Sequence, residues 1–245
     1  MMPSPRVVSR AEWLEARRAH LASEKELTHL RDRVSAERRA MPWVQVDTPY
    51  VFDTPTGTRT LADLFDGRRQ LIVYHFMFGP GWDEGCPSCS FLADHIDGAT
   101  LHLAQRDVTL LAVSRAPLAR IDAFKKRMGW RFPWVSSQGS DFNFDYHVSF
   151  SNDAIARGAV DYNFETRDFP SEEAPGVSVF YRDEPGDVFH TYSTYARGLD
   201  LLVGAYNYLD LAPKGRDEEA LAFTMAWVRH HDRYEGGKHS CDSCC

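Results

Sequence analysis

Hydrophobic residues in this chain form short continuous runs separated by stretches with helical spacing. The runs 71–78 (LIVYHFMF) and 108–114 (VTLLAVS) are almost wholly apolar, which is typical of strands covered on both faces of a parallel sheet. Between these runs, apolar side chains recur at steps of three and four, at Leu92, Ile96, Ala99 and Leu103. The pattern therefore predicts a strand, a helix over 87–105 and a second strand.

The same reasoning predicts further elements on both sides of this unit. Strands are expected at 50–52, 58–61, 132–135, 177–181 and 188–194, and helices from Pro117, at 199–209 and at 217–231. A turn at 183–186 (DEPG) joins the last two strands as a hairpin. A strand–helix–strand unit followed by a hairpin and a helix is the thioredoxin arrangement. We therefore predict an α/β, thioredoxin-like fold, with a mixed sheet flanked by helices.

Both ends of the chain differ from this predicted domain. Residues 1–45 predict a charged helical arm that starts at a capping box, Ser9 with Glu12. The arm could pack on its own domain or form a homodimer contact. The thioredoxin-like domain is expected at 46–234, with an irregular insertion at 136–175, and a flexible cysteine-rich tail at 235–245.

Composition and charge exclude several classes of function. The 245 residues carry a net charge of −7, which argues against a nucleic-acid partner because phosphate contacts need a basic face. No apolar run approaches the roughly 18–20 residues of a membrane span, and the N-terminus lacks the apolar segment of a signal peptide. No glycine-rich phosphate-binding motif occurs, so we expect no organic cofactor. Five cysteines without a secretory signal favour reduced thiols in the cytoplasm.

The most informative motif is Cys86-Pro87-Ser88-Cys89, which lies between the first buried strand and the predicted helix. The positive end of a helix favours a thiolate at its first residue. We therefore expect Cys86 to be the exposed attacking thiolate and Cys89 the buried resolving thiol. Pro87 would stiffen the turn and Ser88 could donate a hydrogen bond to sulfur. The acidic residues 83–84 oppose thiolate formation, so no strongly lowered pKa is expected for Cys86.

Other residues near this motif could support the site. His75, in the preceding strand, could relay protons or be a buried core histidine. Trp82 could form a wall of the thiol pocket or cover the core. Arg115, directly after the second strand, could bind an anionic substrate or form a salt bridge. The pair His230-His231 is interpreted as a solvated helix end.

Three segments of the sequence resemble segments of known protein families. The segment FDTPTGTRTLADLFDGRRQLIVYHFMF resembles the opening of redoxin and alkyl-hydroperoxide-reductase-like proteins. HFMFGPGWDEGCPSCSF and LAVSRAPLARIDAFKKRMGWRFPWVSSQGSDFNFD resemble the DUF899 family of bacterial thioredoxin-like proteins. The resemblance covers roughly residues 7–235 and implies a dithiol–disulfide oxidoreductase with Cys86 and Cys89 as its redox pair. It implies no particular substrate.

Three positions can be compared with thioredoxins and peroxiredoxins: one is similar in its place in the sequence, and two differ. Pro175, directly before a predicted strand, could be the counterpart of the cis-proline that faces the disulfide in thioredoxins, or an ordinary loop proline. Thioredoxins have a tryptophan immediately before the first cysteine, whereas Trp82 lies four residues upstream. Peroxiredoxins have a threonine three residues before the reactive cysteine, and Asp83 stands there, which weakens a peroxidase interpretation.

The function of the tail cysteines, Cys241, Cys244 and Cys245, is left open by the sequence. They could be a redox shuttle for the Cys86–Cys89 pair, or ligands for a soft metal, or have no function. Our leading hypothesis is a thiol–disulfide oxidoreductase that acts on a protein or small-molecule disulfide or thiol and is served by an unknown reductase. The alternatives are a metal-binding or metal-sensing protein that uses both groups of cysteines, and a thiol peroxidase.

Overall fold

The computed structural model describes residues 5–235, which divide after Trp43 into two units. The first unit is α1 (Arg10–Arg39), a helix of 30 residues. It begins at the predicted capping box, in which Glu12 N–H donates to the Ser9 hydroxyl and Ser9 N–H donates to the Glu12 carboxylate. No side chain of α1 is buried, and its part in a dimer contact stays a prediction.

The second unit holds all the remaining elements. In chain order these are β1 (Val44–Gln45), β2 (Val51–Thr54), β3 (Gly57–Thr60), η1 (Asp63–Phe65), β4 (Gln70–His75), α2 (Pro87–Ala93), α3 (Ile96–Ala104), β5 (Val108–Ser114), α4 (Leu118–Arg127), β6 (Trp134–Ser136), α5 (Phe142–Asp145), α6 (Asn152–Ala156), β7 (Val160–Tyr162), β8 (Glu165–Arg167), β9 (Gly176–Arg182), β10 (Val188–Tyr195), η2 (Ala196–Leu202), α7 (Gly204–Leu209) and η3 (His231–Arg233).

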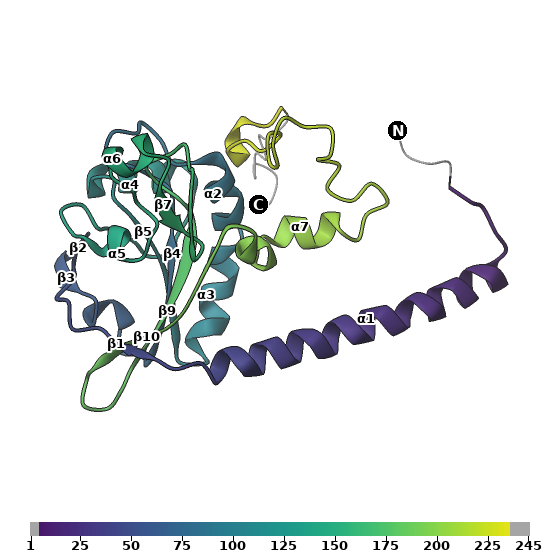
Figure 1. The fold of residues 1–245 in the computed structure, drawn as a ribbon, viewed down its shortest axis with the longest axis horizontal. Helices are drawn as coiled ribbons and strands as arrows, with labels where there is room; N and C mark the ends of the chain where they lie inside the picture. The colour runs from purple at the N-terminus through teal and green to yellow at the C-terminus, as the bar shows by residue number, and fades with distance from the viewer. Residues whose placement is uncertain (1–4, 236–245) are drawn as a thin grey trace, which may run out of the picture. The chain divides into compact units, whose positions relative to one another are not determined.

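The strands form one large mixed sheet in the order β1-β10-β9-β4-β5-β6-β2-β3 (Figure 1). The central strand β4 runs parallel to β5, to which α2 and α3 connect it, and β5 runs parallel to β6. On its other side β4 pairs antiparallel with β9, and the hairpin partner β10 follows. Two parallel strands joined by helices, with an antiparallel hairpin added beside the first, are the core of the thioredoxin fold. The predicted α/β, thioredoxin-like fold is confirmed.

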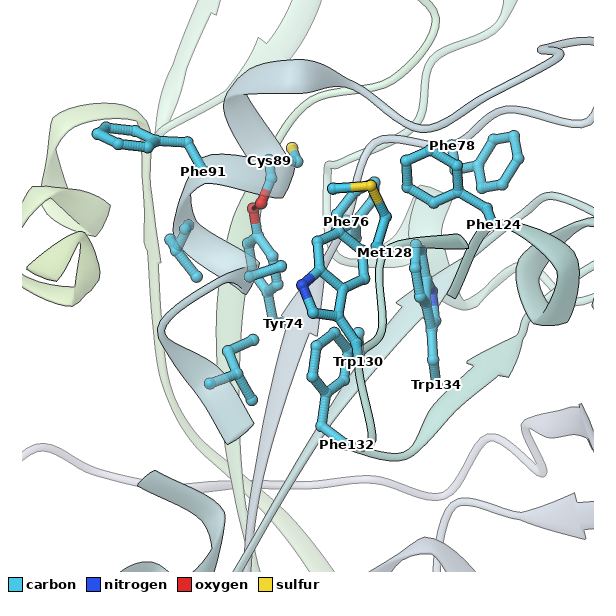
Figure 2. Close-up of a cluster of buried hydrophobic side chains, with 14 of the residues drawn as sticks. Tyr74, Phe76, Phe78, Cys89, Phe91, Phe124, Met128, Trp130, Phe132 and Trp134 are labelled. Carbon is cyan, nitrogen blue, oxygen red and sulfur yellow. Dashed lines mark hydrogen bonds between the residues drawn. The ribbon is translucent and has the colours of Figure 1, made fainter. Parts of the chain in front are cut away.

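The alternation of β4 divides the hydrophobic core into one cluster on each face of the sheet. Tyr74 and Phe76 point to the face covered by α2 and α3, where aromatic rings from the segment that follows α4 also gather (Figure 2). Leu71 and Val73 point to the other face, which is covered by α5. Residues on the two faces of this strand therefore have entirely different neighbours.

Four predicted elements differ from the structure. The helix expected at 199–209 is instead the 3-10 helix η2 followed by α7, with the extended residue Val203 between them. The helix expected over 87–105 is interrupted, because Asp94 accepts from Trp130 Nε1 at 2.8 Å and His95 Nε2 accepts from Ala205 N–H at 3.1 Å. The helix expected at 217–231 is wrong: the segment consists of turns, held by Glu218, which accepts from Trp227 Nε1 at 2.6 Å. The region 136–175 contains short ordered elements from α5 to β8.

Within residues 5–235, no helix is both long enough and apolar enough to cross a membrane.

Candidate dithiol site

Cys86 and Cys89 lie where the chain returns from β4 to start α2. The backbone N–H of Cys86 donates to the carbonyl of Met77 at 3.0 Å, which closes the loop between them. Cys86 is the N-cap of α2, and Pro87 occupies the first turn, where its missing N–H costs nothing. Gly85 has to be glycine, because a Cβ there would lie 2.6 Å from the ring of Phe76. The sequence thus fixes the position of Cys86 at the helix start.

The two thiols differ in exposure and in pKa. Cys86 is partly exposed, whereas the side chain of Cys89 is buried, and the two are not joined by a disulfide. A hydrogen bond from the Cys89 thiol lowers the pKa of Cys86 to about 7, against the opposing effect of burial, and N–H groups of Cys89 and Ser88 contribute further. Burial raises the pKa of Cys89 well above its ordinary value, and the neighbouring Cys86 raises it further. Cys86 is therefore the thiol that ionises first.

A tyrosine hydroxyl and a backbone N–H hydrogen-bond the buried residue Cys89. Tyr74 points from β4 toward Cys89 (Figure 2), and its hydroxyl donates to the Cys89 carbonyl at 3.3 Å. The Met77 N–H donates to the Cys89 sulfur at 3.5 Å, and this bond and the Tyr74 hydroxyl each act to lower the pKa of the Cys89 thiol. Tyr162 comes from β7. Burial raises the pKa of Tyr162, and the negative charge of Cys89 raises it further. Sequence reasoning missed both tyrosines, because no local pattern separates them from other buried aromatic residues.

A search with known family models matches residues 2–234 to a family described as "Bacterial protein of unknown function (DUF899)". This chain belongs to the DUF899 family. The matched segment contains the dithiol site and ends before the tail cysteines. A search of curated protein sequences gives no match.

Among solved structures, this DUF899 protein resembles peroxiredoxin-type proteins at low identity. A mutant of Xanthomonas campestris peroxiredoxin Q is 14% identical, with a TM-score of 0.45 over 67% of this chain and 96% of that one. A mutant of Xylella fastidiosa PrxQ is 11% identical, with a TM-score of 0.43 over 68% and 94%. Peroxidoxin BcpB from Mycobacterium tuberculosis is 12% identical, with a TM-score of 0.44 over 66% and 93%.

Two of the predicted supporting residues lie in the loop and helix start of the DUF899 dithiol site. Ser88 hydrogen-bonds Cys86 through its N–H and its hydroxyl, and both bonds lower the pKa of the Cys86 thiol. Trp82 packs against the same core cluster as Cys86, and its Nε1 donates to Glu172 at 2.8 Å. Arg120 donates to the carbonyl of Trp82 at 2.7 Å, which ties the loop to α4. Trp82 is thus a fixed part of the loop that leads to Cys86.

The peptide bond of Pro175 has a different conformation from that of the thioredoxin proline. No peptide bond within residues 5–235 is cis, so the expected cis-proline is wrong. The Pro175 carbonyl instead accepts a hydrogen bond of 2.8 Å from the Tyr162 hydroxyl, which in turn accepts from Ala196 N–H. The insertion strand β7 thereby holds the segment that enters β9.

His75 lies on the face of the sheet opposite to the thiols, so of its two interpretations the core histidine is the one that the structure contains, and the proton relay is not. Alternation along β4 directs His75 away from Cys89, and its Nε2 is 2.9 Å from Ser178 Oγ. Its ring stacks with Tyr146 at 6.0 Å between centroids. Burial lowers the pKa of His75 to about 3, so the ring is neutral. It is a core histidine.

Arg115 is engaged in a partly buried ion pair. Its Nε donates to Glu173 at 2.9 Å, and its guanidinium lies over the ring of Phe144. Ser149 donates to the second carboxylate oxygen of Glu173, and burial raises the pKa of Glu173 to about 7 in spite of Arg115. Of the two interpretations, the salt bridge is the one that the structure contains.

The acidic loop before Cys86 is held by the end of the described chain. Glu84 accepts from Arg127 at 2.9 Å and from Arg233 at 2.8 and 2.7 Å, so its charge is offset by two guanidinium groups. His230 is 1% exposed and bonds the Gly85 carbonyl at 2.8 Å. The predicted solvated helix end is therefore wrong for His230, whose partners lie far away in the sequence.

The metal-binding alternative depends on residues that lie beyond this site. Cys241, Cys244 and Cys245 fall outside the described residues. Within residues 5–235, His, Cys, Asp and Glu side chains form no group of three or more arranged to hold a metal ion.

Proposed function

We propose that this DUF899 protein is a thiol–disulfide oxidoreductase in which Cys86 attacks and Cys89 resolves. The observation that carries the proposal is the asymmetry of the pair: a partly exposed thiol with a pKa of about 7 is hydrogen-bonded to a buried thiol with a strongly raised pKa. A thiolate with a pKa near ambient pH combines a high ionised fraction with good nucleophilicity.

In the first step, the Cys86 thiolate attacks one sulfur of a substrate disulfide. A bond forms between Cys86 and that sulfur, the substrate S–S bond breaks, and the second substrate sulfur leaves as a thiolate that takes a proton from water. The hydrogen bond from Cys89 and the N–H groups of the first turn hold the Cys86 thiolate before the attack.

In the second step, the mixed disulfide changes the electrostatics of Cys89. Cys86 no longer carries a charge, so one cause of the raised Cys89 pKa disappears. Tyr74 and the Met77 N–H can then stabilise the Cys89 thiolate by hydrogen bonds. This thiolate attacks Cys86, closes the Cys86–Cys89 disulfide and releases the second substrate thiol. The substrate gains two electrons and two protons, which an external dithiol restores to the protein.

The test compares the reduction of insulin disulfides by the wild type, Cys86→Ser and Cys89→Ser, with dithiothreitol as the electron source. We expect Cys86→Ser to lose the activity and Cys89→Ser to stop at a mixed disulfide through Cys86, visible by mass spectrometry. Equal rates for the wild type and Cys86→Ser would refute the proposal. Circular dichroism checks that the variants are folded.

The same proteins separate this function from the peroxidase alternative. Asp83 is exposed and lies where peroxiredoxins use a threonine hydroxyl, so we expect slow consumption of hydrogen peroxide. Rapid, Cys86-dependent peroxide consumption without disulfide reduction would favour the peroxidase instead.

A further inference from the structure

The peptide unit directly before Cys86 is held at both of its ends. Its carbonyl belongs to Gly85 and lies 2.8 Å from Nε2 of His230, and its N–H belongs to Cys86 and donates to the Met77 carbonyl at 3.0 Å. A peptide unit is planar, so hydrogen bonds at its two ends fix its orientation. Gly85 and His230 are both buried, so the bond between them lies away from solvent.

The peptide unit that follows Cys86 is fixed as well. The Cys86 carbonyl accepts from the N–H of Ser90 and from the Ser90 hydroxyl, at 2.9 Å each. With the backbone fixed on both sides, the position of the Cys86 sulfur depends only on rotation about its own side-chain bond. Met77 connects the two cysteines, because its carbonyl bonds the Cys86 backbone and its N–H donates to the Cys89 sulfur at 3.5 Å.

His230 bonds two groups of fixed character. The Gly85 carbonyl can only accept, and Arg127, whose Nη2 lies 3.0 Å from Nδ1 of His230, can only donate. His230 therefore carries its proton on Nε2, donates to Gly85 and is neutral. Its ring also packs against Phe124, with 5.2 Å between the ring centroids. The side chain thus contributes a donor to the loop and a ring to the core, and substitutions can separate the two.

Ion pairs attach residues 230–233 to the same loop. Arg233 donates twice to Glu84, at 2.8 and 2.7 Å, in a fork-like pair. Arg127 bridges the two segments, because it donates to Glu84 and also twice to Asp232, at 2.9 Å each. The loop before the thiol pair is therefore held by side chains that come from far along the chain.

We propose that His230 is a positioning residue for Cys86: by holding the Gly85–Cys86 peptide unit, it keeps the attacking sulfur within reach of the groups that hydrogen-bond its thiolate. The proposal rests on the oxidoreductase function proposed above and adds a residue that acts on that site through the backbone. The groups concerned are the Cys89 thiol and the N–H groups of Ser88 and Cys89. Loss of the His230 bond frees the peptide unit and moves the sulfur away from them, so the pKa of Cys86 rises.

The first experiment measures the pH profile of Cys86 alkylation in two variants that separate the donor of His230 from its ring. His230→Gln keeps an N–H for the Gly85 carbonyl and loses the ring, whereas His230→Phe keeps a ring against Phe124 and loses the donor. We expect His230→Phe to raise the midpoint by about one pH unit, which lowers the rate at pH 7 about five-fold, and His230→Gln to stay close to the wild type. A midpoint unchanged in His230→Phe, or raised equally in both variants, would overturn the proposal.

His231→Phe is the matched control. His231 is the next residue in the same segment, but its Nδ1 lies 2.6 Å from Asp94, at the end of α2, and not on the loop before Cys86. We expect this variant to alkylate with the wild-type midpoint. A shift as large as that in His230→Phe would mean that any change in this segment alters Cys86, which contradicts a specific role for His230.

A second measurement uses the wild type and needs no substitution. Nitrogen-15 NMR with labelled histidine should show His230 as the neutral tautomer that carries its proton on Nε2, with that proton protected from solvent exchange by the bond to Gly85. A tautomer protonated on Nδ1 would overturn the proposal, since Nε2 could then not donate to the Gly85 carbonyl.

The insulin assay separates this proposal from the proposed function. His230→Phe should reduce insulin several-fold more slowly than the wild type at pH 7 and approach the wild-type rate at pH 9, where Cys86 is ionised in both proteins. If the reaction requires Cys86 but His230→Phe matches the wild type at pH 7, only the positioning role of His230 is refuted. If the reaction does not require Cys86, the oxidoreductase function fails, and the alkylation profiles still decide whether His230 positions Cys86.

Discussion

Tyr74 and His75 are neighbours in β4, and both carry a buried polar group, yet they lie on opposite faces of the sheet. Tyr74 directs its hydroxyl to Cys89. His75 bonds Ser178, from which hydrogen-bonded side chains lead through Ser193 to His190. Of the two residues, only Tyr74 bonds a cysteine of the CxxC pair. The comparison teaches that the face of the strand decides whether a buried polar residue serves chemistry or packing.

The pKa values alone would not separate these two residues. Burial raises the pKa of Tyr74 well above its ordinary value, and burial also lowers the pKa of His75 to about 3. Both groups are strongly shifted and both are neutral at pH 7. Perturbed groups cluster at functional sites, but buried structural groups are perturbed as well. A hydrogen bond to a cysteine of the CxxC pair is what distinguishes Tyr74.

The largest expected effect is the loss of stability caused by His75→Ala, on the face of the sheet opposite to the thiols. The substitution leaves a cavity beside Phe142 and Tyr146, so we expect a loss of about 2–4 kcal/mol in the free energy of unfolding. The rate of disulfide reduction per folded molecule should not change. Urea unfolding and the insulin assay measure the two quantities, and a reduced rate in fully folded protein would place His75 in the chemistry.

The pH dependence of this loss follows from the lowered pKa of His75. The neutral ring is favoured in the fold, so its contribution to stability is complete above the ordinary pKa of 6.5 and declines as pH falls toward the folded value of about 3. The difference in stability between the wild type and His75→Ala should therefore shrink between pH 6.5 and pH 3.

Tyr74→Phe tests whether the tyrosine on the face that carries the thiols assists the resolving step. It removes a hydroxyl that stabilises the Cys89 thiolate, and a hydrogen bond to a charged group contributes about 1.5–3 kcal/mol. We expect the resolving step to slow roughly 10- to 100-fold, with accumulation of the mixed disulfide, while the first attack by Cys86 is almost unchanged. Rapid-quench mass spectrometry measures both steps.

Tyr162→Phe is the matched control, because its hydroxyl bonds the backbone of Pro175 and Ala196. It should lower stability and leave the resolving step close to the wild-type rate. Equal slowing in both variants would mean that Tyr74 acts only by holding the fold.

Much of this arrangement was predictable from the sequence. Continuous apolar runs located β4 and β5, and the CxxC spacing placed both cysteines in the first turn of a helix. These features depend on residues close together in the chain. The face to which His75 points was not predictable, because β4 is apolar on both faces and lacks the alternation that would separate them.

The features that the sequence did not indicate depend on distant contacts. Tyr162 reaches the site from a two-stranded insertion, and His230 contacts Gly85 from a segment without helical structure. The predicted helix at 217–231 failed for the same reason: the carboxylate of Glu218 gathers donors from Tyr206 and Trp227, which fixes turns in its place. Local periodicity contains no information about such partners.

On the face that carries the thiols, a smaller effect is expected in the pH dependence of Cys86 alkylation. With a pKa of about 7, the thiolate fraction rises from roughly one tenth at pH 6 to about nine tenths at pH 8, so alkylation should accelerate nearly tenfold. Peptide mapping after iodoacetamide treatment separates Cys86 from the tail cysteines. Cys89→Ala should shift the midpoint upward, since it removes the largest contribution to the lowered pKa. An unshifted midpoint would contradict the hydrogen bond between the thiols.

The smallest expected effect is that of Ser88→Ala. The Ser88 hydroxyl contributes less to the lowered pKa of Cys86 than the Cys89 thiol or the backbone N–H groups, and the N–H of residue 88 remains in the variant. We expect the midpoint of alkylation to rise by a fraction of a pH unit, which reduces the rate at pH 6.5 about two-fold. Pro87→Ala is the control, because Pro87 has no group that donates to sulfur. A shift in Ser88→Ala as large as that in Cys89→Ala would mean that the hydroxyl, rather than the second thiol, sets the reactivity of Cys86.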